Sequence, residues 1–245
     1  MNLAYVCAQI IFESLPISSS THTALLGLTT SLAVDFVAHG PTVLVLAAYF
    51  WRDIVWWFRS WRSYKMTLIA WLEASVVAEC ITAVLYLIFH WWHPHFPLTV
   101  GITISAFLLL SLWFVPHGQR SIPRLSDGVL LGLVQGMVIA LPGVSRMAAT
   151  YTAARWAGMA ASHAFRFSCL LQVPLFAASA LLGLFFLTPT EAASLFSWGS
   201  IASIWFSMLI ALFFLAIVER LALQGGWWLF GIYLLGLETI LFFVR

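Results

Sequence analysis

The chain has 245 residues, of which 62% are hydrophobic and only 8% are charged. Soluble domains carry about 25% charged residues, so this composition excludes a soluble globular protein and indicates one that crosses a membrane several times. The formal net charge of +2 at pH 7 is too small to suggest a nucleic-acid partner. Cys7, Cys80 and Cys169 lie far apart in apolar runs and indicate no disulfide framework.

The first half of the chain begins with two apolar stretches that are too short to span a bilayer. Residues 2–13 and 18–32 fall short of the roughly 20 residues that a span requires, and Leu15-Pro16 lies between them. We interpret them as the two half-helices of a re-entrant hairpin, with one kinked helix as the alternative. Full spans are then predicted at 36–51, 67–90 and 98–115, and a basic loop at 52–66.

The second half repeats this pattern. Residues 127–140 and 145–158 are again short and apolar, and Leu141-Pro142-Gly143 joins them. Gln9 aligns with Gln135, and the same offset aligns Leu15-Pro16 with Leu141-Pro142 and Ser19 with Ser145. Three further spans are predicted at 162–187, 197–218 and 227–244.

Each half therefore contains one half-helix pair and three spans. Three crossings are an odd number, so the second half must lie upside down relative to the first. The predicted fold class is an all-α integral membrane protein with a single domain, residues 1–245. It consists of two inverted-topology repeats at 1–118 and 119–245, each a re-entrant hairpin plus three transmembrane helices.

The distribution of positive charge supports this topology. Lys and Arg gather in 52–66, in 116–126 and at a turn near Arg220, whereas 91–97 and 188–196 carry none. The positive-inside rule assigns the first group to the cytoplasm. Both termini and the first hairpin then face outward, and the second hairpin enters from the cytoplasmic side.

Two proline turns concentrate polar residues in this apolar chain. The first is Glu13-Ser-Leu-Pro-Ile-Ser-Ser-Ser-Thr-His22, and the second is Leu141-Pro-Gly-Val-Ser-Arg-Met-Ala-Ala-Thr150. Helices that begin after these turns present backbone N–H groups without intrahelical partners, and two such helix starts form a cradle for an anion such as phosphate. Gly143 permits a sharp bend, and Arg146 adds a planar fork for phosphate oxygens.

Helical spacing groups the polar side chains of these turns. Ser19 and His22 are three residues apart and share a face, with Glu13 across the proline turn. Arg146 and Thr150 are four apart on the other half-helix. A hydroxyl, an imidazole, a carboxylate and a guanidinium suit phosphoryl transfer to a serine or to water. The alternative is transport, which would use the same anion cradle without hydrolysis.

The two turns resemble the motifs of a known family. They are similar to those of undecaprenyl-diphosphate phosphatases of the bacitracin-resistance type, and this chain is a divergent relative. The resemblance continues through Tyr49-Phe-Trp-Arg-Asp53 and Phe165-Arg-Phe-Ser-Cys-Leu-Leu-Gln-Val-Pro174. It implies hydrolysis of undecaprenyl diphosphate to the monophosphate carrier lipid, with Mg²⁺ or Ca²⁺, in the bacterial inner membrane and with outward access. The carrier lipid would be recycled for cell-wall synthesis. The alternative is a transporter or flippase for a polyprenyl phosphate that uses the same anion cradle without hydrolysis.

The resemblance also implies residue roles. Ser19 is expected to be the nucleophile or its close orienter, and His22 the base or a rival nucleophile. Glu13 is expected to bind metal or hold the imidazole, and Arg146 to stabilise charge on the phosphoryl group. Phosphate-binding residues are expected at Ser18, Ser20, Gly143, Ser145, Arg146 and Thr150, and supporting residues at Gln9, Gln135, His39 and Glu79. For Ser18 and Ser20 the alternative is a bond to their own helix.

Several positions depart from the family pattern or carry isolated polar groups. The family usually has glycine where this chain has Ile10, Thr21 and Ala148, so altered lipid preference or metal dependence is plausible. Arg166 is a candidate partner for Glu73 or Glu79 within the spans. His90, His93 and His95 have metal-like spacing but lie among tryptophans. Membrane lipids and a polyprenyl diphosphate are the expected partners, and a homo-oligomer is left open.

Overall fold

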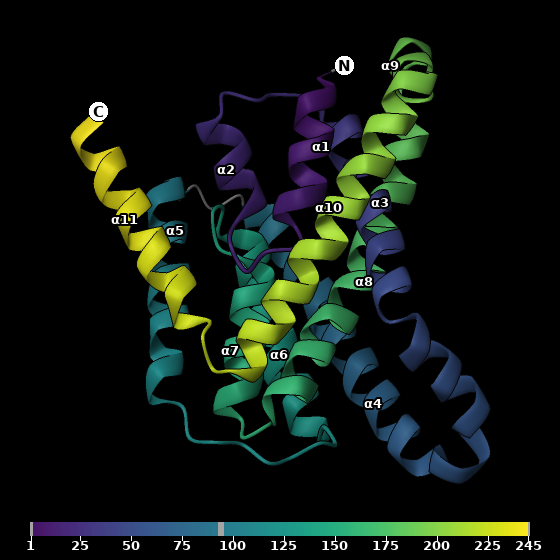
Figure 1. The fold of residues 1–245 in the computed structure, drawn as a ribbon, viewed down its shortest axis with the longest axis vertical. Coiled ribbons are helices and arrows are strands. Elements are labelled where there is room, and N and C mark those ends of the chain that lie inside the picture. Colours follow the sequence, from purple (N-terminus) through teal and green to yellow (C-terminus); the bar gives the residue numbers. More distant parts are fainter. Residues whose placement is uncertain (1, 93–95, 245) are drawn as a thin grey trace.

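A computed structural model describes residues 2–92 and 96–244, which are helical almost throughout (Figure 1). The all-α prediction is therefore confirmed for the described residues. The helices are α1 (Leu3–Phe12), α2 (Ser19–Leu25), α3 (Leu32–Tyr49), α4 (Trp51–Trp92), α5 (Leu98–Ser111), the 3₁₀ turn η1 (Leu112–Phe114), α6 (Leu125–Ala140), α7 (Arg146–Trp156), α8 (Ala161–Phe186), α9 (Pro189–Leu195), α10 (Trp198–Leu223) and α11 (Trp228–Val244).

The lengths of these helices fit a protein that crosses a membrane several times. Four of them, α3, α4, α8 and α10, are long and apolar enough to span a bilayer. Large apolar side chains such as Phe185 and Trp198 are exposed on the outside of the bundle. Contiguous exposed apolar surface is unfavourable in water but suits contact with lipid tails.

The two halves of the chain are interleaved. Helix α3 packs against α8, α4 against α6, α1 against α10, and α5 against α11. The main buried core accordingly takes residues from both halves. Helices α1 and α6 enter the bundle from opposite ends, whereas α1 begins and α11 ends at the same end (Figure 1). The turns that follow α1 and α6 consequently meet inside the bundle.

Two predicted segment boundaries in the first half are wrong for local reasons. The stretch 18–32 is not one half-helix, because α2 ends at Leu25 and Gly27 then adopts a left-handed φ of 65°. The segment 52–66 is helical rather than a loop, and it joins α4 across a kink at Tyr64 (φ −120°, ψ 24°). The basic residues of this segment line one side of a helix and do not break it.

Two boundaries in the second half also differ from prediction. The segment 188–196 contains the short helix α9, which Thr188 and Glu191 start with a reciprocal capping box. Arg220 lies in the last turn of α10 and not in a turn between helices. A basic side chain is stabilised there by the carbonyl end of the helix.

Arg120 fixes the α6–α7 hairpin at the start of the second half. Its Nη2 donates to Oδ1 of Asp127 at 2.9 Å and to the backbone oxygen of Ala157 at 2.6 Å. Asp127 also accepts the backbone N–H of Arg124 at 2.6 Å, which caps the start of α6. One ion pair thus ties the beginning of α6 to the end of α7.

Gly143 is required where the second turn packs against α5. Its φ is +89°, and a Cβ at this position would lie 2.6 Å from the backbone oxygen of Leu98 and 3.3 Å from Oγ1 of Thr21. Any larger residue would be strained by its backbone and would also push the two turns apart.

Gly143→Ala is therefore expected to destabilise the protein by about 1–2 kcal/mol from the left-handed backbone, with a further loss from the clash with Leu98. Thermal unfolding of purified protein in detergent measures this. Gly27→Ala separates the two effects, since its φ is +65° but a Cβ there meets nothing within 4 Å. Gly199→Ala, in open space within α10, is the control. Equal stability of Gly143→Ala and Gly199→Ala would contradict this account.

Candidate active site

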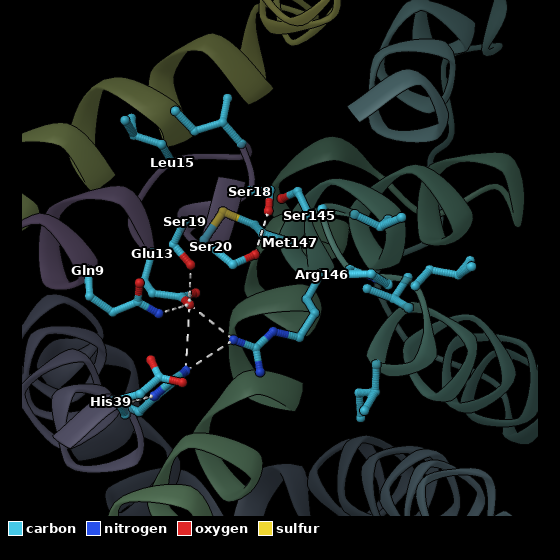
Figure 2. A pocket seen from close by; sticks show the side chains of 18 of the residues that line it. Gln9, Glu13, Leu15, Ser18, Ser19, Ser20, His39, Ser145, Arg146 and Met147 are labelled. Carbon is cyan, nitrogen blue, oxygen red and sulfur yellow. Dashed lines mark hydrogen bonds and ion pairs between the residues drawn. The ribbon is translucent and has the colours of Figure 1, made fainter. Parts of the chain in front are cut away.

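The two proline turns line one cavity of ≈ 230 Å³ between α1, α3 and the start of α7. Figure 2 shows side chains from both turns pointing into it. The predicted residues that line it are Gln9, Glu13, Ser18, Ser19, Ser20, His39, Gly143, Ser145 and Arg146. Both turns therefore contribute to the lining of a single cavity.

One carboxylate oxygen, Oε1 of Glu13, is the centre of the cavity's polar contacts. Oγ of Ser19 donates to it at 2.7 Å, Nε2 of Gln9 at 3.1 Å and Nη2 of Arg146 at 3.0 Å (Figure 2). The Glu13 side chain is only 8% exposed, against 22% for Arg146. A buried carboxylate is costly unless it is paired and hydrogen-bonded, and these three donors meet that requirement.

His39 supplies the imidazole of this group. Its Nδ1 lies 2.9 Å from the backbone oxygen of Asp35, which only accepts, so Nδ1 carries the proton. The lone pair on Nε2 then faces Arg146 Nη2 at 3.4 Å, and Glu13 Oε1 lies 3.7 Å away. The sequence predicts only a supporting role for His39, and the structure places it in contact with both charged residues.

Sequence reasoning missed three residues around this group. The Phe176 ring of α8 lies under the Arg146 guanidinium, 4.6 Å from Cζ to the ring centroid, and its centroid is 5.0 Å from that of His39. Asp35 and Tyr5 also line the cavity, and the Tyr5 hydroxyl donates to Asp35 at 2.5 Å. The spacing of Asp35 and His39, four residues on one helix, was an available signal. No sequence pattern pointed to Phe176.

His22 lies outside this group, which corrects the predicted pairing with Ser19. Its Nδ1 donates to the backbone oxygen of Ser18 at 2.7 Å, and its Nε2 accepts from the Tyr233 hydroxyl of α11 at 2.8 Å. Residues three apart on a helix differ by about 60° in direction. That difference is enough for Ser19 to point into the cavity while His22 points at α11.

Thr150 is also outside the cavity, although it was expected to bind phosphate. Its hydroxyl donates to the backbone oxygen of Arg146 at 2.9 Å and lies 2.5 Å from Oγ of Ser168. Ser168 belongs to α8, so Thr150 joins two helices in the manner of buried hydroxyls in membrane proteins. Arg146 reaches the cavity because α7 begins there and its long side chain extends past the turn.

Ser18 and Ser145 cap the two half-helices. Oγ of Ser18 accepts the backbone N–H of Thr21, and Oγ of Ser145 accepts that of Ala148, both at 3.3 Å. Ser18 Oγ also lies 3.0 Å from Oγ of Ser20. The Ser18 side chain thus caps α2 by accepting an N–H, not by donating to a helix carbonyl, and it lines the cavity as well.

The remaining polar candidates pair elsewhere. Gln135 donates to both carboxylate oxygens of Glu79 at 3.3 and 3.4 Å, and neither lines the cavity. Arg166 pairs with Asp53, not with Glu73 or Glu79, because Arg166 lies near the start of α8 and Asp53 near the start of α4. His93 and His95 lie outside the described residues.

A comparison with protein families agrees with this arrangement. The family described as bacitracin resistance protein BacA matches residues 5–240. The chain belongs to the BacA family. Both proline turns, together with Phe176, His39 and Tyr233, fall within the matched residues.

Several curated proteins are similar to this BacA-family chain, and each is named undecaprenyl-diphosphatase. The protein from Moorella thermoacetica is 34% identical over 195 residues, which cover 72% of this chain and 72% of that protein. The protein from Thermomicrobium roseum is 30% identical over 262 aligned positions, which cover 95% and 92%. The protein from Maricaulis maris is 30% identical over 279 aligned positions, which cover both chains in full (100% and 100%).

Proposed function

We propose that this chain hydrolyses undecaprenyl diphosphate, or a similar polyprenyl diphosphate, to the lipid monophosphate and inorganic phosphate. The observation that carries the proposal is the contact of Glu13 Oε1 with both the Ser19 hydroxyl and the Arg146 guanidinium. A carrier for a phosphate lipid needs cations and dipoles, whereas a carboxylate that accepts from a serine hydroxyl pairs a nucleophile with a base. Membership of the BacA family and the names of its relatives support this reaction.

In the first step Ser19 attacks the terminal phosphorus of the diphosphate. A bond forms between Oγ and phosphorus, the bond to the bridging oxygen breaks, and that oxygen leaves with the lipid monophosphate. The Ser19 proton passes to Glu13 Oε1, 2.7 Å away. Once Glu13 is protonated its attraction for Arg146 falls, and the guanidinium fork turns to the oxygens of the transferred phosphoryl group.

In the second step water attacks the phosphorus of the phosphoserine. The bond between water oxygen and phosphorus forms as the bond to Oγ breaks, and Glu13 returns its proton to Ser19. Nε2 of His39, which lies 3.7 Å from Glu13 Oε1, accepts the water proton. His22 is assigned a structural role, because its Nε2 is engaged by Tyr233.

The start of α7 supplies the second part of the anion site. Ser145 caps the N–H of Ala148, and the N–H groups of the preceding residues in this first turn have no intrahelical partner. The helix dipole adds positive potential at the same point. A phosphate group held there would lie between the start of α7 and the Arg146 side chain.

The divalent cation that the resemblance implies fits the oxygen ligands of the cavity. Oε1 of Gln9 is buried and has no hydrogen-bond partner among the described residues, and Glu13 and Asp35 line the same cavity. Within those residues no three His, Cys, Asp or Glu side chains are grouped to hold a metal ion. We propose that Gln9, Glu13 and Asp35 bind Mg²⁺ or Ca²⁺ together with substrate phosphate oxygens and water, as Mg²⁺ commonly binds. The cation would neutralise charge on the diphosphate.

We also propose that the two halves form an inverted repeat, that the protein lies in the bacterial inner membrane, and that the cavity opens outward. The helix packing supports the repeat, since exchanging the two halves turns the α4–α6 contact into the α10–α1 contact. The same exchange leaves the α3–α8 and α5–α11 pairs unchanged. The family relation supports recycling of the carrier lipid for cell-wall synthesis.

Phosphate release separates hydrolysis from transport. Purified protein with Mg²⁺ is expected to release phosphate from a C55 or C15 polyprenyl diphosphate, both in detergent and in liposomes. Absence of release in both, with lipid monophosphate still crossing the liposome membrane, would refute hydrolysis and support the flippase alternative.

Ser19→Ala is expected to lower kcat by roughly 10⁶-fold, because the nucleophile is lost. Ser14→Ala is the matched control, since Ser14 is buried in the same turn but its hydroxyl donates to the backbone oxygen of Ile11 at 2.6 Å. It should leave kcat unchanged. Turnover of a C15 diphosphate measures both, and full activity of Ser19→Ala would remove it from the reaction.

Arg146→Ala is expected to lower kcat/KM by about 10²–10³-fold. Arg146→Lys should also be impaired, because lysine lacks the planar fork and stacks poorly on Phe176. Arg155→Ala, on the same helix, is the control, since Nη1 of Arg155 bonds the backbone oxygen of Met159 at 2.6 Å. Full activity of Arg146→Lys would show that a point charge suffices.

Removal of divalent cations with EDTA is expected to abolish turnover, and added Mg²⁺ to restore it. Gln9→Ala should raise the Mg²⁺ concentration for half-maximal activity, because a buried oxygen ligand is lost. Gln135→Ala, the equivalent glutamine of the second half, should not, since it bonds Glu79 outside the cavity. Full activity in EDTA, or equal shifts in the two variants, would contradict the cation site.

A further inference from the structure

A second and larger cavity, of ≈ 650 Å³, lies away from the catalytic residues. The end of α3, both parts of α4 around the Tyr64 kink, and the first half of α8 form its walls. Its volume is within the usual range for small-molecule sites, and its lining is largely apolar and aromatic. None of the residues assigned to hydrolysis lines it.

The residues beside the cavity are of the kinds that gather where a membrane meets water. The first part of α4, Trp51–Ser63, combines tryptophans with Arg52, Arg59 and Arg62, a mixture typical of the headgroup region of a bilayer. Figure 1 shows this part at the end of the molecule opposite the start of α1, where the chain doubles back towards the bundle. The kink at Tyr64 produces this reversal and leaves the space between the two parts of α4 and α8.

The charged groups of the cavity are Arg166 and Asp53, which form an ion pair. Nη1 of Arg166 lies 3.2 Å from Oδ1 of Asp53, and their side chains are 44% and 31% exposed. The guanidinium has five N–H donors and the carboxylate about four acceptor sites, so one contact uses only part of their capacity. These are the two charged residues that line the cavity, together with His163, which lies beside Trp71.

We propose that this cavity binds the headgroup of a zwitterionic glycerophospholipid that carries a primary ammonium, such as phosphatidylethanolamine. The phosphate of such a lipid would accept from Arg166, and its ammonium would donate to Asp53. The tryptophan and tyrosine rings beside Asp53 favour a cation as well, and the apolar walls suit the first carbons of the acyl chains. The site is separate from the proposed hydrolysis and does not depend on it.

The charge balance of the cavity distinguishes this ligand from others. One carboxylate and one guanidinium give no net charge, which matches a dipolar headgroup with both signs. A monophosphate or phosphatidylglycerol headgroup brings only negative charge, so Asp53 would repel it while cancelling part of the field of Arg166. A quaternary ammonium would gain the aromatic contact but has no N–H to donate to Asp53.

Native mass spectrometry of the full chain in detergent can measure the affinity for each lipid. The lipids are phosphatidylethanolamine, phosphatidylcholine and phosphatidylglycerol with the same acyl chains. The wild type is expected to bind phosphatidylethanolamine about tenfold more tightly than either of the others, as one charge-assisted hydrogen bond predicts.

Two variants test the assigned contacts. Asp53→Asn should abolish the preference for phosphatidylethanolamine and favour phosphatidylglycerol instead, because the cavity becomes net positive. Arg166→Gln should weaken the binding of phosphatidylethanolamine, because the contact to its phosphate is lost. Glu73→Gln, which removes the same charge from α4 outside the cavity, should change nothing.

Three outcomes would overturn the proposal. They are equal affinities for the three lipids in the wild type, phosphatidylcholine binding as tightly as phosphatidylethanolamine, and an unchanged preference in Asp53→Asn. If Asp53→Asn does not fold, the lipid affinities of the wild type and of Arg166→Gln still test the proposal.

Discussion

A single buried carboxylate oxygen, Oε1 of Glu13, connects the two halves of this protein. Glu13 belongs to the first proline turn and Arg146 to the second, and the 3.0 Å contact between them joins turns 133 residues apart. Burial of a carboxylate in an apolar bundle is unfavourable unless a cation reaches it. The two turns must therefore meet closely, which places a constraint on Gly143, where even a Cβ would collide with α5.

In the proposed reaction, the same contact between Glu13 and Arg146 also supplies the chemistry. Arg146 compensates the charge of Glu13 when no substrate is bound, and the Ser19 hydroxyl donates to the same oxygen. An incoming phosphate offers Arg146 a second partner, so substrate binding and proton transfer from Ser19 to Glu13 support one another. Phe176 and His39 hold the guanidinium in place from the side of α8 and α3. These neighbours let one arginine act in both stages without moving far.

Much of the fold could be predicted from the sequence because its signals are local. Apolar length and proline position indicated α1, α2, α6 and α7. The caps that Ser18 and Ser145 form at the starts of α2 and α7 were not predicted. The directions in which side chains point depend on how each helix is rotated in the bundle, and these could not be predicted. His22 was expected beside Ser19, but about 60° of rotation per three residues turns it to Tyr233. His39, and not His22, is the imidazole beside Glu13. Phe176 comes from α8, and no local sequence pattern reveals how that helix packs. The kink in α4 at Tyr64 has no proline or glycine to mark it in the sequence.

The central claim is that Ser19 is the nucleophile and Glu13 its base. The most direct measurement is an acid quench of the enzyme during turnover of a diphosphate labelled at the terminal phosphorus, followed by peptide mapping. Serine phosphoesters survive acid, whereas phosphohistidine does not. The account predicts acid-stable label on the peptide that contains Ser19, and a greatly reduced yield in Glu13→Gln. A parallel alkaline quench preserves phosphohistidine. Label that survives only the alkaline quench, or full turnover with no labelled enzyme under either quench, would contradict the account.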